Sequence, residues 1–329
     1  MSPEGMNEHN NSLEDLIFFH TIDIYIGLIG VFLNVLLLSV FFSKRAFFAK
    51  NKMLVVLALG DLSACLGTFL LGYTRKSIYQ DELNNTPLPI QTAWSCTQKW
   101  FVWFRLWGAV IPSAAVLWIA IERLLAVFAP IFFRTHIVKN PTRSCVLVLT
   151  YALFITISAF FIAHSRRLLT VKNYCGRKAS FSNTFSTYIY ISAITGYTLA
   201  LGLNCVTLLK LKQMHSKMKN RELQSHFRIL RYMVLISLIS TLAVIIPNAL
   251  SLFGAFYGRV DIAVSETANW FGAVKSSVNI LIYFVLKPDF QSRALKLLRL
   301  VPKSKASEYE SQIVSKSSPE LMQHSLLSN

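Results

Sequence analysis

The sequence has 329 residues and a formal net charge of +17, yet only 15% of its residues are charged and 53% are hydrophobic. Its mean hydropathy of +0.47 is far too high for a soluble protein of this size, so the composition excludes a soluble domain and indicates a polytopic membrane protein. The excess positive charge suits the anionic headgroups of a lipid bilayer and an acidic partner surface, and not nucleic acid.

Seven apolar segments follow one another along the chain, each close to the roughly 20 residues that a membrane-spanning helix needs. They are residues 22–42, 53–71, 100–121, 145–163, 188–209, 232–253 and 267–286. The seventh is the weakest in hydropathy because Lys275 and several polar residues interrupt it, and such a helix usually faces the interior of a bundle. We therefore predict an all-α fold, a seven-transmembrane helix bundle over residues 22–286.

The two ends of the chain differ in character from this domain. Residues 1–21 are predicted to form an extracellular N-terminus without a cleavable signal peptide, because they carry no Lys or Arg before the first long apolar run. Residues 287–300 carry apolar and basic positions on opposite faces, which predicts a short amphipathic eighth helix at the membrane surface. The Ser-rich residues 301–329 are predicted to be a disordered cytoplasmic tail.

Basic residues in the connections set the predicted orientation. Of the 33 Lys and Arg residues, 22 fall in connections on the side that holds the C-terminus and nine on the opposite side. The positive-inside rule then places the N-terminus outside the plasma membrane. Both N-glycosylation sequons, at Asn10 and Asn84, fall on the outer side, which agrees with this topology.

The third segment ends in the run Glu-Arg-Leu-Leu-Ala-Val-Phe-Ala-Pro, from Glu122 to Pro130. Adjacent ionic residues at the end of a span are a functional hypothesis by default. The run resembles the Asp-Arg-Tyr signature of rhodopsin-like (class A) G-protein-coupled receptors, with Glu122 for Asp and Leu124 for Tyr. The resemblance implies that Glu122 and Arg123 serve G-protein coupling, and that Arg123 pairs with Glu122 and with polar groups of the sixth helix at rest.

Further motifs extend this resemblance over roughly residues 20–299. Asn34 in the first helix, Asp61 in the second and Pro247 in the sixth stand where these receptors place the same residues. The run from Asn279 to Tyr283 is similar to the seventh-helix Asn-Pro-x-x-Tyr motif, and the resemblance implies a part for both residues in activation. It also implies that Phe290 begins the short eighth helix.

Several positions depart from the family pattern. Ile280 replaces the seventh-helix proline, Ile245 a sixth-helix tryptophan, and Thr241 a phenylalanine. This relaxed pattern is similar to the nematode serpentine chemoreceptors of class sx. The resemblance implies a receptor for a small-molecule chemosensory cue, with a heterotrimeric G protein as partner and with arrestin and a receptor kinase acting at the tail.

Two of the five cysteines, Cys96 and Cys175, are placed by this topology in the oxidising compartment. They match the disulfide that ties the second outer loop to the third helix in rhodopsin-like receptors. Two free thiols are the alternative.

A core polar site is expected from Asn34, Asp61, Lys275 and Ser276. In the family the aspartate lines a pocket that often holds a sodium ion, but Gly108 and Pro112 here occupy positions that would help to bind it. Because a lone buried charge is costly, we predict that the Lys275 ammonium pairs with Asp61 and takes the role of the ion. In the alternative, Lys275 reaches a water-filled cavity without touching Asp61.

Arg105 is the candidate ligand-binding residue. It lies eighteen residues before Arg123, where many receptors of this family place a ligand contact. An arginine there favours an agonist with a carboxylate or phosphate group through bidentate hydrogen bonds. A structural arginine that pairs with Glu266, or that extends to the membrane surface, is the alternative.

Other function classes fit less well. No catalytic constellation, metal-ligand spacing or phosphate-binding loop stands out, so no enzyme activity, cofactor or metal is expected. A seven-helix channel or transporter would commonly show internal repeats or paired broken helices. An opsin would carry its retinal-binding lysine at Ala273, roughly 200° around the helix from Lys275. A neuropeptide remains the alternative ligand.

Overall fold

The computed structural model describes residues 3–86, 90–171, 175–217, 221–256, 262–286 and 288–297. Within these ranges, the side chains of residues 3–11, of most residues between 215 and 236, and of a few single residues lie outside the description. The described chain is helical apart from one pair of two-residue strands, so the predicted all-α class is confirmed.

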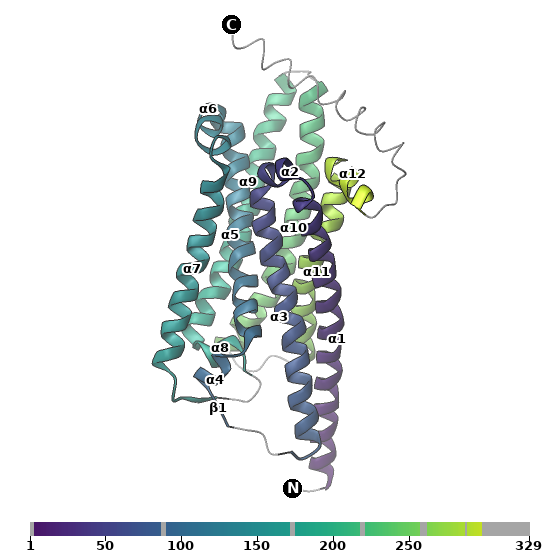
Figure 1. The fold of residues 1–329 in the computed structure, drawn as a ribbon, viewed down its shortest axis with the longest axis vertical. Helices are drawn as coiled ribbons and strands as arrows, with labels where there is room; N and C mark the ends of the chain where they lie inside the picture. The colour runs from purple at the N-terminus through teal and green to yellow at the C-terminus, as the bar shows by residue number, and fades with distance from the viewer. Residues whose placement is uncertain are drawn as a thin grey trace.

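Seven long helices run along the length of the molecule (Figure 1). They are α1 (Pro3–Phe42), α3 (Lys52–Leu83), α5 (Trp100–Phe128), α7 (Pro141–Ser165), α9 (Asn183–Lys217), α10 (Arg221–Phe256) and α11 (Ile262–Leu286).

Short elements cap the two ends of this bundle. At one end lie α4 (Ala93–Thr97), α8 (Arg177–Ser180) and the antiparallel strands β1 (Gln91–Thr92) and β2 (Thr170–Val171). At the other lie α2 (Arg45–Lys50), α6 (Pro130–Phe132), the π-helix η1 (Phe133–Val138) and α12 (Pro288–Leu297). We refer to these as the disulfide end and the α12 end.

Six described helices are long and apolar enough to cross a membrane: α1, α3, α5, α7, α9 and α10. On α7, Leu153, Phe154 and Phe161 are about 60% exposed or more, and such side chains suit contact with lipid tails. The helix with Lys275, α11, is not among the six, yet it packs against α1, α3 and α10 within the same bundle. Lys275 is buried on this helix, which agrees with its prediction as an interior helix.

Several observed helices extend beyond the ends of the predicted segments. α1 begins at Pro3 and not at residue 22, and α3 continues to Leu83 and not only to residue 71. The polar extensions are packed together, because the buried His20 ring stacks on Tyr79 with their centroids 5.5 Å apart. A hydropathy window responds only to apolar residues, so it ends a helix where its sequence turns polar.

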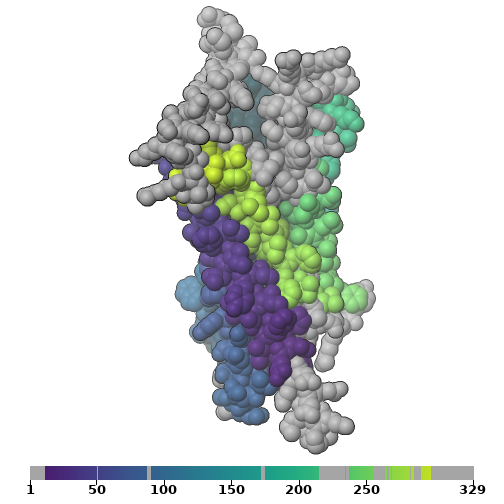
Figure 2. All heavy atoms as spheres, turned by 90° about the vertical axis from the view of Figure 1, so that its right-hand side faces the viewer, coloured from purple at the N-terminus to yellow at the C-terminus, as the bar shows by residue number. Residues whose placement is uncertain are grey.

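On the face shown in Figure 2, α1 runs between α3 and α11. Close approach of α1 to α3 requires a small residue, since a Cβ at Gly27 would lie 2.6 Å from the backbone nitrogen of Phe69. At the α12 end, Phe290 is fully buried with its ring 5.6 Å from that of Phe41. The predicted amphipathic eighth helix is thus anchored on α1 by its apolar face.

Candidate functional site

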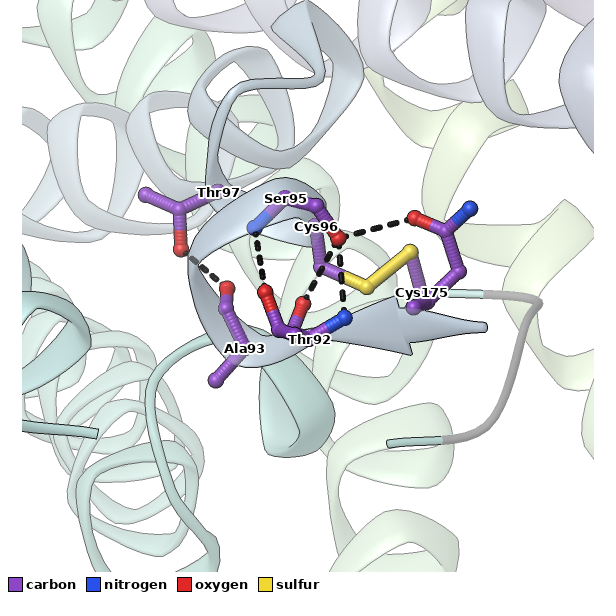
Figure 3. Close-up of a disulfide and its surroundings, with 7 residues drawn as sticks. Thr92, Ala93, Ser95, Cys96, Thr97 and Cys175 are labelled. Carbon is purple, nitrogen blue, oxygen red and sulfur yellow. Dashed lines mark hydrogen bonds between the residues drawn. A yellow bond between two sulfur atoms is a disulfide. The ribbon is translucent and has the colours of Figure 1, made fainter. Parts of the chain in front are cut away.

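The disulfide between Cys96 and Cys175 is present and joins positions 79 residues apart (Figure 3). Cys96 was expected at the start of the third helix, but it lies on the separate short helix α4, before α5 begins at Trp100. The start of α4 is held by Thr92 and Ser95, whose side chains each bond the other's backbone N–H. Cys175, just before α8, is thereby tied to α4, which directly precedes the start of α5.

A cavity of about 130 Å³ lies inside the bundle, with walls from α1, α3, α5, α8, α9, α10 and α11. Its charged lining residues are Asp23, Arg105, Arg177 and Lys275. Arg105, the ligand candidate from the sequence, is placed on this wall, while the side chain of its alternative partner Glu266 lies outside the described residues.

Asp23 was not singled out from the sequence. Its Oδ2 lies 2.9 Å from Nδ1 of His20, and its Oδ1 accepts a hydrogen bond of 3.0 Å from Nε1 of Trp270. Both His20 and Asp23 are buried, so this group ties α1 to α11 beside the cavity. Its position just inside an apolar segment could have indicated a functional or structural role, because a charge there requires a partner.

Asp61, Lys275 and Asn279 come together halfway along the bundle. Nζ of Lys275 lies 3.0 Å from Oδ1 of Asp61, and Nδ2 of Asn279 donates to Oδ2 of the same carboxylate. The ammonium also donates to the hydroxyl of Tyr197 at 3.0 Å. Because the Asp61 side chain is fully buried and that of Lys275 is 8% exposed, both charges depend on these partners.

Asn34 and Ser276 lie next to this group. Nδ2 of Asn34 donates to the backbone carbonyls of Gly30 (2.9 Å) and Ser276 (3.0 Å), so Ser276 contributes its backbone to the contact. Ser277, which the sequence did not single out, lies 3.8 Å from the Cys65 sulfur through its Oγ. These contacts join α1, α3 and α11 at the same depth.

Toward the α12 end, Arg123 contacts α9. Its Nη1 lies 3.5 Å from Oδ1 of Asn204, a long hydrogen bond, and Nδ2 of Asn204 lies 3.3 Å from Oγ of Ser237 on α10. The chain Arg123–Asn204–Ser237 therefore connects three helices. Asn204 was missed in the sequence, although an amide within an apolar segment is a recognisable signal.

The expected pairing of Arg123 with Glu122 is not formed as a direct ion pair in this structure. Glu122 accepts a hydrogen bond of 2.9 Å from Nε1 of Trp118, one turn earlier, and no ion pair joins it to Arg123 in the described part of the chain. Successive residues on a helix point about 100° apart, so neighbours in sequence do not face each other.

Tyr283 lies at the junction of α1, α11 and α12. Its ring centroid is 5.8 Å from that of Phe41 and 6.0 Å from that of Phe290.

Of the two predicted glycosylation sites, Asn84 is exposed just after α3, at the disulfide end. The side chain of Asn10 and the predicted tail at 301–329 lie outside the described residues.

Comparison with known proteins supports one family. No curated protein matches the chain. The sequence model of the serpentine type 7TM GPCR chemoreceptor Srsx matches residues 27–298, which is well over half of the chain and runs from within α1 to the end of α12. This chain is thus a multi-pass membrane protein and a receptor, not an enzyme, and it belongs to the Srsx family of seven-transmembrane chemoreceptors.

Proposed function

We propose that this receptor binds a small-molecule chemosensory cue in the cavity and passes the signal to a heterotrimeric G protein at the α12 end. The observation that carries the proposal is the path along α11. Lys275 lines the cavity, shares the Asp61 carboxylate with Asn279, and is followed two turns later by Tyr283 beside α12. A ligand that moves Lys275 therefore acts on the same rigid element as the α12 end.

The shape of the cavity supports a small ligand over a neuropeptide. Its volume of about 130 Å³ has room for a few heavy-atom groups only. The disulfide holds α8 against the bundle, and Arg177 of α8 forms part of the cavity wall. A peptide is expected to place at most one end in this cavity.

The chain Arg123–Asn204–Ser237 is the proposed coupling element. It bonds α5, α9 and α10 near the α12 end through two long contacts, which are weak enough to exchange partners. A ligand shifts such an equilibrium only by binding one arrangement more tightly than the other. Arg123 would then be released toward the G protein.

Orientation and location follow from charge and chemistry. The disulfide and the exposed Asn84 lie at the same end, and the connections of the α12 end carry most of the basic residues. We infer that the disulfide end faces outward from the plasma membrane and that the α12 end meets the cytoplasm. Arrestin and a receptor kinase would act at residues 301–329.

A cell assay tests the proposal. The receptor is expressed with a promiscuous G protein and a calcium reporter, and small metabolites and peptides are screened as separate libraries. We expect a metabolite response that Arg123→Ala reduces at least tenfold at equal surface expression. Arg134→Ala removes an exposed arginine at the same end and serves as the matched control with an unchanged response.

Two results would contradict the proposal in different ways. A response confined to peptides would overturn the small-molecule ligand and favour the neuropeptide alternative. A response that persists in full after Arg123→Ala would point to a ligand-gated channel.

A further inference from the structure

The charges on the cavity wall are unequal. Among the described residues that line it, three are cationic (Arg105, Arg177, Lys275) and one is anionic (Asp23). Asp23 already has His20 at one oxygen and Trp270 at the other, and Lys275 already has Asp61 and Tyr197. Arg105 also has an interaction within the protein, which leaves Arg177 as the lining cation to consider.

Arg177 is the cation whose bonding is incomplete. Its Nη1 is buried and, among the described residues, has no hydrogen-bond partner. The guanidinium lies over the Tyr190 ring, 4.8 Å from the centroid, which favours the charge but gives the Nη1 hydrogens no acceptor. A buried guanidinium donor without an acceptor is costly. Because Arg177 is also part of the cavity wall, an acceptor bound in the cavity could relieve this cost.

Arg177 is also held in place. It follows Cys175 by two residues, and the disulfide bonds Cys175 to Cys96 on α4. On its other side, Nζ of Lys178 donates to the backbone carbonyl of Ser251 on α10 at 3.3 Å. The guanidinium thus sits on a segment fastened at both sides, which is the arrangement that a specific binding group requires.

We propose that the cavity binds a small organic carboxylate, with Arg177 as its principal anchor and Arg105 in the same cavity wall. This inference rests on the proposed function for the site and adds the chemical class of the ligand. A carboxylate presents two coplanar oxygens that match the planar fork of a guanidinium, and it is the smallest organic anion to do so. An ammonium group offers Nη1 of Arg177 no acceptor, and a neutral carbonyl offers an acceptor without the charge that strengthens the bond.

The test is ligand-induced thermal stabilisation of the full-length receptor, purified in lipid nanodiscs without a G protein. The probes are short aliphatic and aromatic carboxylates (acetate, butyrate, hexanoate, benzoate, 4-hydroxybenzoate), each paired with its primary amide. We expect at least one carboxylate to raise Tm with a half-saturating concentration at least tenfold below that of its amide. Arg177→Gln should abolish that preference.

Two further variants control for folding and charge. Arg177→Lys keeps the charge but loses the fork, so it should retain a weaker preference for the acid. Arg167→Gln removes an exposed arginine from the same end of the bundle and should leave the preference unchanged. The inference is overturned if no carboxylate stabilises the receptor, if amides or amines stabilise it equally well, or if Arg177→Gln keeps the acid preference.

The experiments distinguish a failure of the carboxylate inference from a failure of the proposed receptor function. A neutral compound that drives Arg123-dependent signalling, with no acid preference in nanodiscs, would refute the carboxylate and leave the receptor function standing. A carboxylate that stabilises the receptor through Arg177 but never produces a G-protein response would support the site and refute the coupling.

Discussion

Lys275 and Asp61 form a buried pair that we regard as a tethered-cation device. Each charge is removed from water, and we propose that the ammonium takes the role of a bound sodium ion beside Asp61. Breaking such a pair by removing one partner costs roughly 3–5 kcal/mol, because the remaining charge stays buried without compensation. The hydrogen bonds from Asn279 and to Tyr197 add to this dependence.

A double-mutant cycle tests the pair. Lys275→Asn should lower the stability of the purified receptor by roughly 3–5 kcal/mol in the absence of sodium. Sodium should recover part of that loss in the variant and have no effect on the wild type. The double change with Asp61→Asn should regain most of the stability, because neither charge is then left alone. Thermal unfolding at matched ionic strength, with sodium or choline as the cation, is the measurement. Independent, additive losses would refute the tethered cation.

At the scale of elements, the disulfide ties α4 to the segment that carries α8. We expect alkylation of the intact receptor without prior reduction to modify neither Cys96 nor Cys175. Changing both to serine should lower stability by about 2–4 kcal/mol and release the α8 wall of the cavity. Cys205→Ser, which changes a free cysteine in α9, is the control and should have little effect. Labelling of both outer cysteines before reduction would contradict the bond.

The existence of the helices could be predicted from sequence, but their extents could not. Apolar runs revealed all seven helices, and the polar α11 was recognised as an interior helix from Lys275. The additional turns of α1 and α3 were missed, because they are polar outside and are held by contacts such as that of His20 with Tyr79. Such contacts depend on which helices are neighbours, which no single segment reveals.

The candidate site, like the helices, could be predicted from the sequence only in part. The pairing of Lys275 with Asp61 could be predicted because charged residues within spans require partners. Asn279 was assigned to activation by its motif, and only the structure places it on the same carboxylate. The Glu122–Arg123 pair failed because adjacency in sequence was given more weight than helix geometry. Arg177 could not be identified, since in the sequence it is one of five basic residues in its connection and only the folded loop brings it to the cavity.

For the whole molecule, we predict that the disulfide end faces outward from the membrane. The exposed Asn84 lies in a sequon at the disulfide end, so in eukaryotic cells it should carry an N-linked glycan. Peptide N-glycosidase treatment should increase the gel mobility of the wild type more than that of Asn84→Gln, with Asn10→Gln testing the other sequon. An epitope placed after residue 329 should be accessible to antibody only in permeabilised cells. Staining of that epitope on intact cells would reverse the topology.

The most direct test of the receptor function is guanine-nucleotide exchange by a purified G protein in nanodiscs that contain this chain. We predict that the agonist identified in the cell assay accelerates exchange over the ligand-free receptor, and that Arg123→Ala removes at least nine-tenths of this acceleration while leaving agonist-induced stabilisation intact. Arg134→Ala should behave as the wild type. Agonist binding without any acceleration of exchange, tested across the major G-protein classes, would contradict the account.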